Sequence, residues 1–414
     1  MKAGSLRGPA LAAGIGCAIC IGLGLIPLFM GTFPVFLKPV SMEFGWGFSV
    51  FPQSMMVVGV TGALAGPFFG RLVDRYGVRR FLAPGIVLWC TALFSMSLLN
   101  GKIVSLYLVA ILIGLGGTLA GPITYLKVVG GWFDRNRGLA LGLVASGAPA
   151  VTTAVAIIAS QQIIEIYDWR NAYRALAVVA LVVSLPTALL LVRERPAVAR
   201  PDTFHPAAEG LTAGEALRTV DFWLVIGASC LAAGALMSVS SHFAAWMSER
   251  GVSTSVTTLA LSLYSLAGPV GPLVGGLLLD RVRSPKILAA FFMMPLFGIL
   301  MLLYGGSAGI VPGMVLLGLG FSSILGFAPY LVSRYFGMKC ASEILGITFA
   351  VLTVAMGVAP VGVGLVHDLL HGYDLSMAVL ACVIALAFGG SLLFRPYRFA
   401  APVRSEASQI VLAT

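Results

Sequence analysis

The sequence is poor in charge, since only 10% of its 414 residues are Asp, Glu, Lys or Arg. Soluble globular domains carry about 25% charged residues, so an ordinary water-exposed surface is excluded. Histidine is scarce, with 4 residues in the chain. The 6 cysteines have no partner set with the spacing of a zinc site or a disulfide framework. We therefore expect neither a metal nor a cofactor.

Apolar sequence is abundant: 59% of the residues are hydrophobic, and the mean hydropathy is +0.99. Apolar runs of about 20 residues recur, the length that a helix needs to cross hydrocarbon. Lipid cannot satisfy backbone polar groups, and a barrel would show alternating segments of about ten residues. The runs therefore predict an all-α membrane protein with twelve transmembrane helices. The expected spans are 10–36, 50–71, 81–99, 103–127, 138–161, 172–192, 221–243, 256–279, 287–305, 309–332, 344–366 and 375–394.

The longest polar interval falls near the middle of the chain and predicts a division into two halves. We expect an N-terminal six-helix bundle over 1–192, a cytoplasmic linker over 193–220, a C-terminal six-helix bundle over 221–394 and a cytoplasmic tail over 395–414.

The two halves also resemble each other in sequence. Gly66-Pro67 at the end of span 2 recurs as Gly271-Pro272 at the end of span 8, 205 residues later. The loop pair Asp74-Arg75 likewise recurs as Asp280-Arg281. Parallel six-span repeats of this kind are typical of two-halved transporters. The sequence thus predicts two six-helix pseudo-repeats.

The distribution of Lys and Arg predicts the orientation. With both termini on one side, 20 of the 26 residues fall on that side and 5 on the other, while Lys127 lies within span 4. Such an excess marks the cytoplasmic side, so we expect a multi-pass protein of the cell inner membrane with both termini cytoplasmic. Because the basic residues occur in short clusters between apolar runs, the lipid bilayer is the expected partner and nucleic acid is not. A monomer is expected.

The loop after span 2 has the features of a gate. It reads Gly70-Arg-Leu-Val-Asp-Arg-Tyr-Gly-Val-Arg-Arg80, in which Gly77 permits a tight turn and the arginines lie at headgroup level. Charge pairs there would hold the cytoplasmic side shut and break when the halves rock; a basic loop that merely snorkels is the alternative. The predicted gating residues are Asp74, Arg75, Gly77, Arg135, Arg137, Asp280 and Arg281.

This loop resembles the signature of the major facilitator superfamily, and the resemblance implies the major facilitator fold. The stretch Gly131–Gly147 is similar to the signature that opens span 5 in the monocarboxylate porter family, and Glu43–Trp46 and Leu331–Gly337 resemble its bacterial members. The resemblance covers about residues 10 to 395. It implies transport of small organic anions such as lactate or pyruvate, often with a proton.

The chain also departs from that family. Span 8 lacks the Asp and Arg of animal members, span 11 lacks the Lys of the neighbouring oxalate–formate exchangers, and the start of span 10 lacks acidic residues. A transporter of a drug or neutral metabolite therefore stays open as an alternative, and so does a membrane sensor without transport. Because no catalytic or nucleotide-binding motif is present, we expect no enzyme.

Ionisable groups inside a membrane are candidate substrate ligands because their burial is costly. Lys127 would pair with a substrate carboxylate, although it lies near a span end and has the alternative of snorkelling. Arg174 shares a helix face with Arg170, and with Asp168 and Glu165 nearby an ion-pair cluster at the outer rim is the alternative to substrate binding.

The other candidates are aromatic. His242 would carry a proton or serve as a hydrogen-bonded structural residue, and the hydroxyls of Tyr125, Tyr264 and Tyr330 would orient a carboxylate or pack at interfaces. Because no Asp or Glu falls deep in a span, we expect weak proton coupling, coupling through His242, or facilitated exchange.

Overall fold

The computed structural model describes residues 7–132, 142–193, 210–281, 284–337 and 339–399. In this part of the chain every regular element is a helix, apart from one isolated β-bridge between Gly210 and Gly337. Twelve of the helical segments described there are long and apolar enough to span a membrane. The predicted all-α fold with twelve spans is confirmed.

Each half contributes six of these segments. The N-terminal half contains α1 (Arg7–Gly22), the π-helical turn η1 (Ile26–Met30), α2 (Phe33–Phe44), α3 (Gln53–Tyr76), α4 (Arg79–Ser95), α5 (Ile103–Leu119), α6 (Pro122–Trp132), η3 (Leu143–Gly147), α8 (Ala148–Ile166) and α9 (Trp169–Leu191). The C-terminal half contains the short α10 (Ala213–Leu217), then α11 (Val220–Glu249), α12 (Thr254–Ala267), α13 (Val270–Arg281), α14 (Ile287–Tyr304), α15 (Gly306–Gly326), α16 (Ala328–Phe336), α17 (Ala341–Leu370) and α18 (Asp374–Leu392).

Three spans are broken at proline. Span 4 breaks between α5 and α6 before Pro122, span 8 between α12 and α13 at Pro269, and span 10 between α15 and α16 before Pro329. Proline lacks the N–H that would continue the helix, and its ring clashes with the preceding turn. The short helices α6 and α16 that follow carry two of the candidate tyrosines.

Several spans extend beyond their predicted ends, and those of α11 and α17 do so at the same face. α11 continues six residues past the predicted end at 243 because its last turns still bury Ala245, Trp246 and Met247. The chain then turns at Gly251, with φ of 70°. α17 similarly continues to Leu370 and ends at His371, whose φ of 54° lies in the left-handed region. These extra turns position the residues described below.

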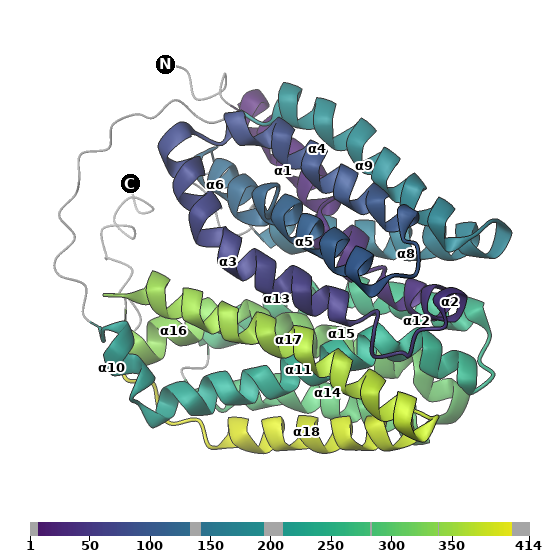
Figure 1. Cartoon of the computed structure of the whole chain (residues 1–414). Helices are drawn as coiled ribbons and strands as arrows, with labels where there is room; N and C mark the ends of the chain where they lie inside the picture. Colours follow the sequence, from purple (N-terminus) through teal and green to yellow (C-terminus); the bar gives the residue numbers. More distant parts are fainter. Residues whose placement is uncertain (1–6, 133–141, 194–209, 282–283, 338, 400–414) are drawn as a thin grey trace.

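The two halves lie side by side as two bundles (Figure 1), with α1, α4 and α9 in one and α11, α14 and α18 in the other. An even number of crossings returns the chain to the face where it began. We call that face, which carries Arg7 and Phe399, the termini face. The opposite face, with loops 45–52, 250–253 and 371–373, is called the far face.

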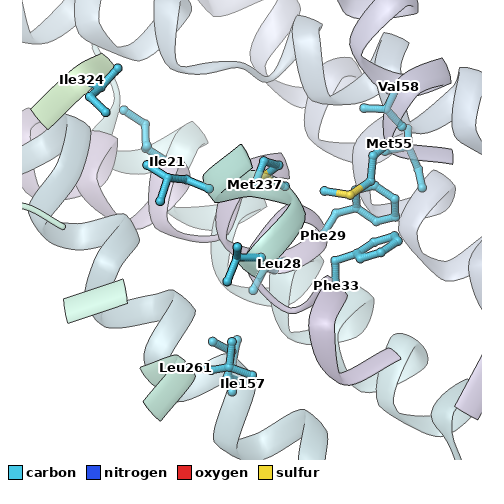
Figure 2. Close-up of a cluster of buried hydrophobic side chains, with 14 of the residues drawn as sticks. Ile21, Leu28, Phe29, Phe33, Met55, Val58, Ile157, Met237, Leu261 and Ile324 are labelled. Carbon is cyan, nitrogen blue, oxygen red and sulfur yellow. The ribbon is translucent and has the colours of Figure 1, made fainter. Parts of the chain in front are cut away.

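The halves meet through three helix pairs: α2 with α11, α3 with α17, and α8 with α12. One cluster of buried apolar side chains crosses this boundary. Figure 2 shows part of it, including Leu28, Phe29 and Phe33 of the N-terminal half and Met237 and Leu261 of the C-terminal half. Burial of this shared apolar surface stabilises the contact between the halves.

Hydrogen bonds between the halves cluster in the part of the boundary near the far face. Lys38 Nζ of α2 donates to Ser248 Oγ of α11 over 2.6 Å. Ser262 Oγ of α12, which donates to the carbonyl of Thr258 over 2.8 Å, also lies 3.3 Å from the carbonyl of Ala154 in α8. The strongest set of such bonds involves the carboxylate of Asp368.

Candidate functional site

The three candidate tyrosines lie in three different environments. Tyr125 of α6 is buried inside the N-terminal half, where its hydroxyl meets the thiol of Cys20 in α1. Tyr264 of α12 packs on Phe321 of α15 at 6.3 Å between ring centroids, with its hydroxyl buried. These two hydroxyls lie in different halves, each within its own bundle.

Tyr330 belongs to a cluster at the termini face. Its ring packs edge-on against Tyr397 at 5.8 Å, and the Arg334 guanidinium lies 4.8 Å from the centroid of Tyr397. Arg334 in turn donates to the carbonyl of Phe399 over 3.2 Å. This cluster fastens the segment after α18 onto α16.

The predicted gate is described only in part. Gly77 ends α3 with φ of 82°, and its N–H donates to the carbonyl of Val73 over 3.0 Å, so it makes the tight turn that the sequence predicts. The guanidinium of Arg75 lies 5.3 Å from the centroid of the Tyr76 ring. Arg135 and Arg137 lie outside the described residues, as do the side chains of Asp74, Lys127, Asp280 and Arg281.

The cationic cluster at the start of α9 lies at the far face. Arg170 forms an ion pair with Glu43 of α2 and lies 4.3 Å from the centroid of the Trp169 ring. Arg174 donates to Asn171 Oδ1 over 3.2 Å. Asp168 instead caps α9 by accepting the N–H of Asn171 over 2.6 Å. Position 170 thus takes part in an ion pair at the rim, but its partner is remote in sequence.

Asp368 joins the two halves at the far face. It lies near the end of α17, and its Oδ1 and Oδ2 accept the backbone N–H groups of Phe48 and Ser49 over 2.6 and 3.0 Å. These amides belong to the loop that leads into α3 in the other half. Hydrogen bonds to an ionised acceptor are about twice as strong as neutral ones. We call Asp368, Phe48 and Ser49 the far-face latch.

Two glycines allow the close approach that the latch requires. A Cβ at Gly47 would meet the Asp368 carboxyl carbon at 2.8 Å. On the other side, a Cβ at Gly364 would meet Ser49 Cα at 2.5 Å. The loop itself is held to its own half, since Trp46 Nε1 donates to the carbonyl of Gly101 over 3.1 Å.

His367 lies directly beside the latch and is 7% exposed. Its Nε2 is 2.7 Å from Glu249 Oε1 of α11, a distance at which one of the two atoms must donate a hydrogen bond to the other. Its Nδ1 is 3.7 Å from Asp368 Oδ1 and has no hydrogen-bond partner among the described residues. The ring lies 4.4 Å from that of Tyr373 and 4.6 Å from that of Phe48.

His242 lies one layer deeper and is fully buried. Its Nε2 is 2.9 Å from the carbonyl of Pro360, and its Nδ1 is 3.1 Å from the Tyr373 hydroxyl. A carbonyl only accepts, so Nε2 carries the hydrogen. Nδ1 of the neutral ring then accepts from Tyr373. A hydrogen-bonded structural residue is one of the two roles that the sequence left open for His242, and this geometry fits it. Tyr373 connects His242 to the latch.

Two cavities open near the latch. One, of about 500 Å³, is lined by Trp246, Glu249, Arg250, His371, Gly372, Tyr373 and Asp374. The other, of about 300 Å³, lies between the halves and includes Lys38, Gln161 and Ser248 in its lining. Glu249 therefore touches solvent-accessible space on one side and His367 on the other.

The latch was not identified from sequence. Asp368 and Glu249 lie at span ends, and their partners are remote along the chain: the Asp368 bonds join residues 320 and 319 positions apart. The sequence signal that could have indicated the latch is a group of three polar residues, His367, Asp368 and His371, at the end of the otherwise apolar span 11.

The sequence model of the Major Facilitator Superfamily matches residues 19–360. The chain belongs to this superfamily.

Relatives and solved structures agree with this assignment. YcxA of Bacillus subtilis, an uncharacterized MFS-type transporter, is 23% identical over 377 residues, which cover 87% of this chain and 89% of that protein. A bacterial homologue of the human lysosomal transporter Spinster, solved in an inward-facing and unoccupied conformation, has a TM-score of 0.72 at 13% identity, covering 95% of this chain and 98% of that one. The nucleoside transporter NupG also has a TM-score of 0.72, at 11% identity, covering 93% of this chain and 99% of that one.

Monocarboxylate transporters match over a shorter stretch. Monocarboxylate transporter 3 of Mus musculus is 32% identical over 142 residues, which are 34% of this chain and 28% of that protein. Monocarboxylate transporter 2 of Rattus norvegicus is 28% identical over 172 residues, 40% of this chain and 33% of that protein. The chain thus shares about a third of the length of these relatives.

Proposed function

We propose that this superfamily member is a secondary transporter that moves a small organic anion, a monocarboxylate such as lactate or pyruvate, across the cell inner membrane. It acts as a monomer by alternating access, in which two bundles rock around a central site. The observation that carries the proposal is the contact between two six-span halves, with hydrogen bonds gathered near one face. The partial similarity to monocarboxylate transporters supports the substrate class.

The Lys and Arg excess of the termini face supports an orientation with both termini in the cytoplasm and the far face toward the periplasm. The described conformation is then closed toward the periplasm by the far-face latch. The substrate carboxylate is held by Lys127 of α6, the cation within span 4.

Uptake of labelled pyruvate and lactate into proteoliposomes tests the proposal. A charge-assisted hydrogen bond contributes about 1.5–3 kcal/mol, so Lys127→Ala should raise the KM about 10- to 150-fold. Lys102→Ala is the matched control, because Lys102 is exposed before α5. Equal KM values in both variants would remove Lys127 from the site while leaving the anion assignment intact.

A neutral cargo is the second candidate. The buried polar side chains of α11 and α12 include Ser229, Ser238 and Ser262. Each donates its hydrogen to the carbonyl four residues earlier, which leaves the oxygen able to accept from a neutral metabolite. If neither pyruvate nor lactate enters while a known porter is active in parallel, the monocarboxylate assignment is wrong. Neutral and hydrophobic compounds would then be screened in the same vesicles.

A further inference from the structure

We propose that His367 Nδ1 is a proton-binding site at the far face, and that its occupation releases the far-face latch. The inference rests on the proposed alternating access, since the latch must break whenever the far face opens. The ligand is a proton taken from the periplasmic side. The gating loop does not belong to this site, and of the candidate substrate ligands His242 lies beside it, through Tyr373.

The first step is the state of the imidazole in the closed conformation. The 2.7 Å contact between His367 Nε2 and Glu249 Oε1 is satisfied when Nε2 donates to the carboxylate. Nδ1 then carries a lone pair that is buried and unpartnered among the described residues. With Nε2 engaged by Glu249, Nδ1 is the ring position that is open to a further proton.

The second step is competition for one oxygen. Oδ1 of Asp368 lies 3.7 Å from Nδ1 and also accepts the Phe48 N–H over 2.6 Å. A proton on Nδ1 turns that nitrogen into a charged donor aimed at Oδ1. The oxygen is drawn toward the imidazolium and the bond to Phe48 weakens. The Phe48 bond, one of the two that join the halves, is thereby exchanged for a contact within α17, and the latch is left with the Ser49 bond to Oδ2 alone.

The surrounding charges favour a proton over a metal ion. Glu249 and His242 face the ring from α11, Asp368 faces it from α17, and the Tyr373 ring covers it before α18. Loop 45–52 of the other half carries no ionisable side chain. The carboxylate oxygens receive N–H donors and do not converge on an empty centre, and no group of three metal-ligating side chains occurs in the described part of the chain.

The cavity of about 500 Å³ supplies the route. Glu249 lines it, and the Glu249 side chain is 38% exposed while its Oε1 holds the imidazole. Arg250, His371 and Asp374 line the same space, and the Arg250 and Asp374 side chains approach to 4.0 Å. Tyr373 lines the same cavity and its ring covers that of His367, so on that side the cavity wall lies one residue away from the imidazole.

The test is a distance measurement that needs no substrate. Spin labels are placed at Tyr167→Cys and Leu375→Cys, which are 72% and 55% exposed on different halves at the far face, in full-length protein whose native cysteines are replaced. Lowering the pH from 8 to 5.5 should move the distance distribution to longer values. His367→Gln should abolish this shift, because the amide keeps a donor for Glu249 and cannot take a proton.

His371→Gln is the matched control, since His371 lines the cavity without touching the latch, and it should respond to pH like the parent protein. Asp368→Asn should lengthen the distance at both pH values. A parent protein whose distance ignores pH, or a His367→Gln variant that responds normally, would overturn the inference. This experiment can be told apart from the test of the proposed function. A pH-dependent change in distance that requires His367 supports the proton site even if no anion is transported, and anion uptake supports the proposed function even if the distance does not change with pH.

Discussion

The contact between α17 and loop 45–52 can be tested by adding a single methyl group. Gly364 is packed so tightly that a Cβ would meet Ser49 Cα at 2.5 Å and Phe48 C at 2.6 Å. These are backbone atoms, which move only if the loop and α17 separate. We therefore expect Gly364→Ala to destabilise the closed far face.

The magnitude follows from the cost of overpacking, about 1–3 kcal/mol in a well-packed interior. If opening of the far face relieves this whole overpacking cost, the ratio of open to closed molecules rises about 5- to 150-fold. Gly362→Ala is the matched control, because a Cβ there meets nothing within 4 Å. Both variants share the gain in helix propensity from replacing glycine, so the difference between them isolates the steric effect.

The spin-label pair at positions 167 and 375 measures this ratio directly. Gly364→Ala should populate longer distances, and Gly362→Ala should match the parent protein. Identical distributions for the two alanine variants would refute the reasoning, since they would show that loop 45–52 accommodates the methyl group without parting from α17.

Two further predictions concern stability and pH. His242→Ala leaves the Tyr373 hydroxyl without its partner, so it should lower the free energy of unfolding by about 1–3 kcal/mol. The measurement is a fall in Tm in detergent, and an unchanged Tm would show that water replaces the ring. The Thr212 backbone N–H and hydroxyl hold the pKa of Glu215 below its usual range. Because the pKa is lowered in the folded state, the α10 capping box should be fully formed at pH values above the ordinary Glu range. It should be lost as the pH falls through the lowered pKa. Hydrogen exchange at the Thr212 amide reports this loss, and Thr212→Ala should move it to higher pH.

The sequence by itself determined the class of fold. A segment that crosses lipid must be a long apolar helix, and apolar runs of that length can be recognised in the sequence without knowledge of the packing. It also predicted the turn at Gly77, because a positive φ at a helix end selects glycine locally. Its span ends were less accurate where packing decided them: α11 continues to Glu249 because Trp246 and Met247 are buried against other helices.

Only the tertiary structure decided which polar residues meet. Arg170 pairs with Glu43 and not with its neighbour Asp168, which caps its own helix. Asp368 binds two backbone N–H groups, and amides are present at nearly every position, so no residue pattern marks them. The packing of α3 against α17 brings these groups together across about 320 residues. Hydropathy specifies that each helix crosses the membrane, whereas the partner of each charge depends on the rotation and depth at which the helices pack.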